Sequence, residues 1–260
     1  MRSPGLLALA LAGCIAVAAG AARGSETRAT ADPHCAVVRE LRAIDGDLPA
    51  ARAAIAEGQK LTIVALGSSS TLGVGASSDE RTYPAVLRQE LARLLPGHEV
   101  NVVNAGIGGN SAHQMYQRIQ SDVLDEEPKL VVWQTGIYDA VHDHGVERFK
   151  RILRKGIAML REGGADVVLM DQIPLPRAER FPSYPAYVEA LREVARETAT
   201  PVFRRHDLLA TLVRDGRLSA EELIPADAQS RVDGSYHCVG TNLARSLAEK
   251  LSPRAVPERN

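Results

Sequence analysis

The chain has 260 residues with 31 basic and 32 acidic side chains, so its formal net charge is only −1. This balance, without a basic stripe or an acidic block, argues against a nucleic-acid-binding protein and against an acidic interaction tail. Hydrophobic residues make up 45% and aromatic residues only 4%, so aliphatic side chains must fill the core of what we expect to be one α/β domain.

The N-terminus has the pattern of a signal peptide over residues 1–24, with one early Arg, an apolar run and then small residues. We expect cleavage between Ala18 and Gly24. The segment Leu11–Cys14 also resembles a bacterial lipobox, so lipidation of Cys14 is an alternative. A transmembrane span is disfavoured because the run is rich in Ala and Gly. Both alternatives predict an exported protein: cleavage gives a periplasmic or secreted protein, and lipidation gives a lipoprotein.

Two cysteines, Cys35 and Cys238, remain after the leader. In an oxidising compartment such a pair predicts a disulfide, and two free thiols are the alternative. The sequence has no CxxC motif and no Cys/His spacing typical of structural zinc, so no metal and no cofactor are expected.

After a polar spacer and a helical lead-in over residues 25–60, strands and helices alternate through a domain over residues 61–252, and residues 253–260 form a tail. Strands are predicted at Leu61–Leu66, Val100–Asn104, Leu130–Gln134, Asp166–Asp171 and Pro201–Phe203. Helices are predicted at about Tyr83–Leu95, Ser111–Leu124, Val146–Glu162, Tyr184–Thr198 and Thr241–Leu251. Single helices between strands imply right-handed crossovers and a three-layer, flavodoxin-like, doubly wound parallel sheet of about five strands.

The segment LTIVALGSSST, residues 61–71, is the most informative stretch of the chain. An apolar strand is followed by Gly67, which permits a sharp turn, and then by three serines at the edge where open α/β sheets bind ligands. A hydroxyl held there is a candidate nucleophile. The structural alternative is a serine-rich loop that caps the next helix.

Three further loops carry polar residues, at NAGIGGN over 104–110, TGIYD over 135–139 and DGSYH over 233–237. Together with GSSST, and in this order, they resemble the blocks of the SGNH/GDSL hydrolases over about residues 61–251. The resemblance implies Ser69 as nucleophile, His237 as base and Asp233 as the residue that orients His237. It also implies an oxyanion hole from the N–H groups of Ser69 and Gly109, with Tyr138 at the third position.

Three positions depart from the family pattern. Ser68 replaces the Asp beside the nucleophile, and Tyr138 replaces the oxyanion-hole Asn. Asp233 and His237 are separated by three residues instead of two, so a deletion could have removed the family histidine and left His237 as a bystander.

Other motifs favour structural interpretations. His206 is an alternative base, although it more simply caps a turn. His142 and His144 suggest a metal site, but a solvated loop is the simpler interpretation because alternate loop residues give no fixed ligand geometry. GIGG over 106–109 lacks the spacing and the acidic residue of a dinucleotide site.

The sequence therefore predicts a serine esterase that acts on small O-acyl esters or acylated glycans through an acyl-enzyme, without a nucleic-acid partner or a membrane span. One alternative is a catalytically degraded carbohydrate-binding or envelope-assembly protein, favoured by the altered third and fourth blocks. The other is an O-acyltransferase, in which a sugar hydroxyl replaces water.

Overall fold

The computed structural model describes residues 32–225, 227 and 231–252. The predicted signal peptide, the lipobox and the C-terminal tail lie outside the described residues. From Asp32 onward the chain forms one compact unit, which includes the helical lead-in. In the part of the chain that is described, we find no helix with the length and apolarity needed to cross a bilayer.

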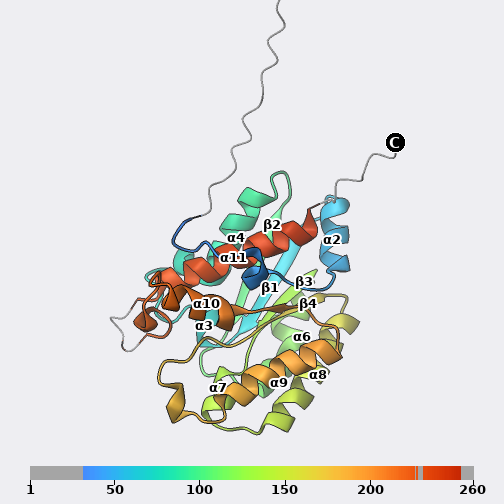
Figure 1. The fold of residues 1–260 in the computed structure, drawn as a ribbon. Coiled ribbons are helices and arrows are strands. Elements are labelled where there is room, and N and C mark those ends of the chain that lie inside the picture. The colour runs from blue at the N-terminus through green and yellow to red at the C-terminus, as the bar shows by residue number, and fades with distance from the viewer. Residues whose placement is uncertain (1–31, 226, 228–230, 253–260) are drawn as a thin grey trace, which may run out of the picture. The chain divides into compact units, whose positions relative to one another are not determined.

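Five parallel strands form the central sheet in the order β2-β1-β3-β4-β5 (Figure 1). This order confirms the predicted doubly wound, flavodoxin-like topology. The strands are β1 (Leu61–Gly67), β2 (Val100–Gly106), β3 (Leu130–Gln134), β4 (Asp166–Met170) and β5 (Val202–Phe203). The chain order reverses between β1 and β3, and a doubly wound sheet binds its ligands at this switch point.

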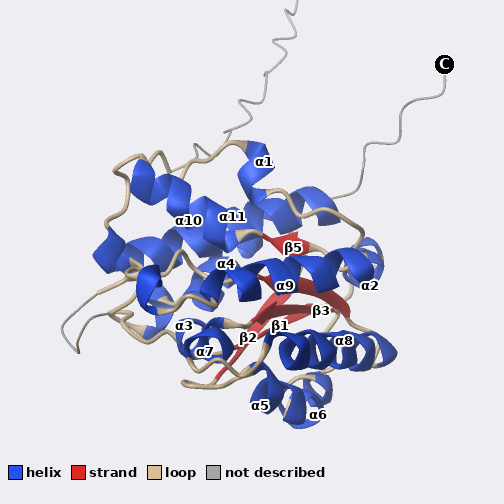
Figure 2. Cartoon of the chain, turned by 60° about the horizontal axis from the view of Figure 1, so that its bottom comes forward, coloured by secondary structure: helices blue, strands red, loops and turns tan. Residues whose placement is uncertain are grey.

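Helices cover both faces of the sheet and make the three layers visible in Figures 1 and 2. One face carries α2 (Pro49–Ala56), α4 (Tyr83–Leu94), α10 (Arg205–Arg214) and α11 (Asp233–Leu251). The other carries α5 (Ala112–Gln117), α6 (Ile119–Asp122), α8 (Val146–Glu162) and α9 (Tyr184–Glu197). The short helices are α1 (Arg39–Arg42), α3 (Ser69–Leu72) and α7 (Ile137–Val141). Two separate apolar cores result, one on each face of the sheet.

The predicted strands match the structure within two residues, but two helix predictions need correction and one helix was not predicted. The helix expected over Ser111–Leu124 is interrupted at Arg118, whose side chain reaches back to the loops at the strand ends. Helix α10 was not predicted, although its Leu208, Leu209 and Leu212 are buried.

The last helix begins at Asp233, eight residues before the predicted start at Thr241. Packing explains the extension, because α11 lies against α4 and Gly240 permits the close approach. A Cβ at Gly240 would lie 2.7 Å from Val86 Cβ. Tertiary contact thus overrides the weak helix propensity of the two glycines in this segment. The consequence for function is that Asp233 and His237 belong to a helix and not to a loop.

The predicted disulfide between Cys35 and Cys238 is confirmed, with the two Cα atoms 4.8 Å apart. It joins the lead-in to α11. Asn242 strengthens the same junction by donating from Nδ2 to the carbonyl of Cys35 at 2.9 Å.

Candidate active site

Ser69 is the first residue of α3, directly after the turn that ends β1. The turn requires glycine at position 67, because a Cβ there would lie 2.0 Å from Thr71 Oγ1 and 2.7 Å from Gln134 Oε1. As the first residue of a helix, Ser69 has an N–H with no acceptor inside that helix. Its side chain is exposed. The local fold therefore presents a hydroxyl and a free N–H at the switch point of the sheet.

A single buried amide fixes the shape of this turn. Gln134, the last residue of β3, is fully buried, and its Oε1 accepts hydrogen bonds from Ser68 N at 3.0 Å, Ser68 Oγ at 3.2 Å and Thr71 Oγ1 at 3.0 Å. Tyr83 supports the same network, since its hydroxyl lies 3.0 Å from Thr71 Oγ1. Burial raises the pKa of Tyr83 to about 12. Ser68, at the family's Asp position, thus serves the turn and carries no charge.

Two arginines hold the turn from other directions. Arg118 donates from Nη2 to the carbonyl of Gly67 at 3.0 Å and from Nε to Asn110 Oδ1 at 2.9 Å, which ties the first loop to the second. Arg205 is buried and donates from Nη1 to Ser70 Oγ at 3.1 Å. The nucleophile candidate is therefore held on a rigid support.

Ser69 opens onto a small cavity of about 130 Å³. Its lining includes the three residues expected around an oxyanion, and it consists of Ser68, Ser69, Gly109, Ile137, Tyr138, Val141 and His142. Gly109 has a φ of +73°, a conformation that favours glycine. Loops after three different strands thus converge on one hollow.

Tyr138, at the position where the family has Asn, presents an aromatic ring to this cavity. A Cβ placed on Gly109 would lie 3.8 Å from Tyr138 Cε2. The Tyr138 ring also stacks on His142, with centroids 3.9 Å apart and an interplanar angle of 24°. The residue at the family's Asn position is therefore one wall of the cavity.

The structure gives Asp233 and His237 partners other than each other. His237 Nε2 lies 3.0 Å from Asp32 Oδ2. Asp233 accepts hydrogen bonds from Ser77 N at 2.8 Å and Ser77 Oγ at 2.6 Å. His34 N–H, more than the His237 ring, holds the pKa of Asp32 below its ordinary value. The pairing expected between Asp233 and His237 is replaced by one between His237 and Asp32, beside the disulfide.

The other histidines of interest lie in two places. His142 and His144 follow α7, where His142 Nδ1 lies 3.0 Å from the carbonyl of Tyr138 and His144 Nδ1 lies 3.4 Å from Asp139 Oδ1. Asp139 is buried and also accepts from Ala112 N at 2.8 Å, so it caps α5. This aspartate thus holds the second and third loops together.

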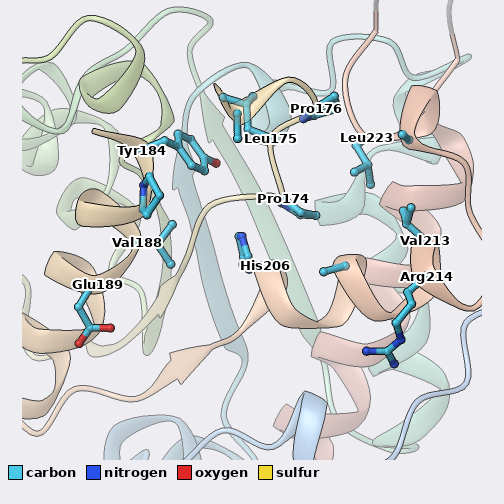
Figure 3. Close-up of a pocket in the computed structure, with 14 residues that line it drawn as sticks. Pro174, Leu175, Pro176, Tyr184, Val188, Glu189, His206, Val213, Arg214 and Leu223 are labelled. Atoms are coloured by element: carbon cyan, nitrogen blue, oxygen red, sulfur yellow. The ribbon is translucent and has the colours of Figure 1, made fainter. Parts of the chain in front are cut away.

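His206 lies in a different and larger cavity of about 570 Å³. Figure 3 shows its ring at the start of α10, between Val188 and Pro174. The ring Nδ1 of His206 is 3.2 Å from Asp207 Oδ1, and the backbone N–H of His206 donates to Asp171 Oδ1 at 2.8 Å. Ser69 is not among the residues that line this cavity, and His206 does not line the Ser69 cavity.

One group of possible metal ligands occurs among the described residues, formed by Asp32, Cys35 and His237 with their ligand atoms within 4.8 Å of one another. The Cys35 sulfur is already bonded to Cys238, so it is not a thiolate and does not fit a zinc site. The pair His142 and His144 is not part of this group.

Comparison with known proteins identifies the class. A model of the Non-GDSL lipase-like family matches residues 34–253, so the chain belongs to that family. The match confirms the resemblance to the SGNH/GDSL hydrolases that the four loops indicated.

Three similar proteins show how far the likeness extends. An uncharacterized lipoprotein, YqeF of Bacillus subtilis (strain 168), is 34% identical over 122 residues, which cover 44% of this chain and 49% of that protein. Esterase TesA of Pseudomonas aeruginosa is 31% identical over 140 residues, 54% of this chain and 64% of TesA. The chain therefore spans 49% and 64% of the lengths of these two curated relatives. A two-domain esterase active on acetylated mannans shares the fold, with a TM-score of 0.67 and 21% identity over 82% of this chain and 56% of that one.

Sequence reasoning missed two contributors to this site. His142 lines the Ser69 cavity, although the sequence suggested only a loop or a metal ligand; its position shortly after a strand-end block was the available signal. Gln134 shapes the turn, and a polar residue at the end of an otherwise apolar strand was the signal for it.

Proposed function

We propose that this protein is a serine ester hydrolase in which Ser69 attacks the ester carbonyl and forms an acyl-enzyme. The observation that carries the proposal is the cavity where Ser69, Gly109 and Tyr138 meet at the switch point of the sheet. The N–H groups of Ser69 and Gly109 are suited to a developing oxyanion, and such donors are worth about 10²–10³ in turnover each. Membership of a lipase-like family supports this chemistry.

The cavity volume favours a short acyl group. A space of about 130 Å³ is well below the several hundred Å³ typical of sites that enclose a drug-sized ligand. It suits an acetyl-sized group, while the alcohol part of the ester remains outside. The likeness to an esterase active on acetylated mannans supports an acylated glycan as the substrate, in which the glycan is the alcohol part of the ester.

An exported location is part of the proposal. The disulfide is expected to persist only in an oxidising compartment, and one curated relative is a lipoprotein. Intact mass of the protein purified from its native envelope distinguishes cleavage near Ala18 to Gly24 from lipidation at Cys14.

Covalent labelling tests the nucleophile. We expect a fluorophosphonate to modify Ser69 stoichiometrically, with the adduct located by peptide mapping. Ser69→Ala is expected to lose the label, whereas Ser78→Ala, at an exposed serine outside the turn, is the control that keeps it. Turnover of 4-nitrophenyl acetate should exceed turnover of the decanoate ester, because the cavity is small.

Two other functions are outcomes of the same assays. Absence of label on Ser69 between about pH 6 and pH 9 would favour a glycan-binding protein, an alternative supported by Tyr138 in place of Asn and by the engagement of His237 with Asp32. Release of acyl sugar instead of free acid, when acceptor sugars are added, would identify an O-acyltransferase.

A further inference from the structure

We infer that His142, and not His237, is the general base that activates Ser69. The inference rests on the proposed hydrolase function and assigns a proton acceptor to it. Among the described residues that line the Ser69 cavity, His142 is the one that carries an imidazole. A neutral imidazole is the side chain best suited to accept a proton near neutral pH.

The contacts of His142 set the tautomer that a base requires. Nδ1 lies 3.0 Å from the carbonyl oxygen of Tyr138, which has no proton to donate, so Nδ1 must carry the hydrogen. Nε2 then holds the lone pair. In serine hydrolases a hydrogen bond at Nδ1 likewise leaves Nε2 free to receive the serine proton. Here a backbone carbonyl takes the place of the usual carboxylate.

Two further contacts restrict the ring. It stacks on Tyr138, and the backbone N–H of His142 donates to the carbonyl of Tyr138 at 3.1 Å. The nearby His144 lies 5.8 Å away between ring centroids, and its Nδ1 faces the buried Asp139. His142 lies at the solvent-accessible end of α7.

The competing histidines are engaged in other contacts. His237 uses Nε2, the nitrogen that would face a serine, to contact Asp32. His206 lines the separate, larger cavity and pairs with Asp207. Within the described residues no hydrogen bond joins Ser69 Oγ to any imidazole, so the exposed Ser69 hydroxyl and His142 Nε2 must approach each other in the complex, as catalytic groups of unliganded enzymes often do.

The proposed reaction is a conventional acyl transfer. Ser69 Oγ bonds to the ester carbon while its proton passes to His142 Nε2, and the carbonyl electron pair moves to the oxygen facing the N–H groups of Ser69 and Gly109. The intermediate then collapses, the C–O bond to the alcohol breaks, and His142 Nε2–H protonates the departing oxygen. A water molecule then gives a proton to Nε2 while its oxygen bonds to the acyl carbon. The bond between that carbon and Ser69 Oγ breaks, Nε2–H returns the proton to Oγ, and the acid is released.

The experiment compares three matched substitutions, His142→Gln, His144→Gln and His237→Gln, in the full-length protein. The readouts are the second-order rate of fluorophosphonate labelling at Ser69 and the turnover of 4-nitrophenyl acetate. We expect His142→Gln to slow both by about 10²–10⁴, the usual range for general-base catalysis, and the other two to change them less than about threefold.

Chemical rescue separates a base from a merely structural residue. Added imidazole should restore labelling of His142→Ala at least about tenfold and leave wild type and His144→Ala unchanged. Thermal melting is expected to be the same for all variants, because none of these side chains is buried. If wild type is labelled at Ser69 but His142→Gln keeps the full rate, the inference is overturned while the hydrolase stands. If wild type is not labelled at all, the proposed function fails and this inference fails with it.

Discussion

The turn after β1 and the start of α11 were both expected to contribute to one active site, yet they differ in what their polar groups do. At the β1 turn the chain around Ser69 is held by hydrogen bonds: Gln134 accepts them, and Arg118 and Arg205 donate them. The Ser69 hydroxyl itself is left exposed. At α11 the side chains of Asp233 and His237 are themselves the supports, because they bind Ser77 and Asp32.

The contrast shows how a site can be distinguished from a structural junction. In a functional site the reactive side chain has no hydrogen-bond partner within the protein, whereas the groups that surround it are hydrogen-bonded and held in place. In a structural junction the polar side chain itself makes hydrogen bonds to other parts of the protein. By this criterion we propose the β1 turn as the site, and the start of α11 as a structural junction with the N-terminal lead-in. The following predictions test that division, beginning with the largest expected effect.

Removing the disulfide should destabilise the protein strongly and leave the site intact. Cys35→Ser with Cys238→Ser opens a covalent loop that spans 203 positions of sequence, and loss of a native disulfide typically costs about 2–5 kcal/mol. Urea unfolding measures the cost. The labelling rate of Ser69 in the folded double variant should equal that of wild type. A large loss of labelling in protein that is still folded would show that the two regions are coupled.

Removing the acceptor in β3 should affect both stability and labelling. Gln134→Leu removes the acceptor of Ser68 N, Ser68 Oγ and Thr71 Oγ1, but Thr71 Oγ1 can still bond to the Tyr83 hydroxyl. Two buried donors of Ser68 then stay unpaired at about 1–3 kcal/mol each, and about 3 kcal/mol in total is expected. Labelling of Ser69 should fall more than tenfold. Gln172→Leu is the matched control, because this buried amide after β4 donates one hydrogen bond, to Tyr187, and should leave labelling unchanged.

The contribution of the Tyr83 hydroxyl, which contacts Thr71 in the turn after β1, to the stability of the folded protein should fall at alkaline pH. Burial raises the pKa of Tyr83 from 10.0 to about 12, so the unfolded chain loses the phenol proton before the folded chain does. The stabilisation from the neutral phenol is therefore complete below pH 10 and is lost as the pH rises toward 12.

Comparison with Tyr83→Phe isolates this contribution. The difference in unfolding free energy between wild type and the variant should shrink by about 1 kcal/mol between about pH 9 and about pH 11, because a tenfold change in an ionisation constant corresponds to about 1.4 kcal/mol. Denaturant titrations at the two pH values measure it. A difference that stays constant would contradict a raised pKa for this phenol.

The pair between Asp32 and His237 should matter least. Both side chains are more than a third exposed, and exposed ion pairs contribute about 0–1 kcal/mol. His237→Gln and Asp32→Asn are each expected to change stability by about 0.5 kcal/mol or less. The lowered pKa of Asp32 means that its contribution is present above pH 3.8 and is lost as the pH falls through the folded pKa. If His237→Gln greatly lowers turnover while its unfolding free energy stays close to that of wild type, His237 contributes to catalysis and the division between the two regions is wrong.

Much of the fold was predictable because buried parallel strands have a local signature. The run Leu61–Leu66 and the segment Leu130–Gln134 are apolar on both faces, and their bounds agree with the structure within one residue. The bounds of helix Val146–Glu162 agree with the prediction, since its apolar stripe and the glycines after it are also local features. The start of α11 was not predictable, because its early turns pack on residues far away in the sequence: Gly234 lies close to Leu218 and Glu222, and Gly240 lies close to Val86 of α4.

The sequence by itself determined the sheet, the position of Ser69 at its edge and the pair of cysteines able to bridge, since each follows from neighbouring residues and from general rules for parallel sheets. Only the tertiary structure decided which imidazole lies beside the serine. That choice depends on which way α7 and α11 direct their side chains: α7 ends at the Ser69 cavity, whereas α11 turns His237 toward Asp32. Side-chain direction on a helix is fixed by where the helix begins and what it packs against, and both are set by contacts between residues far apart in the chain.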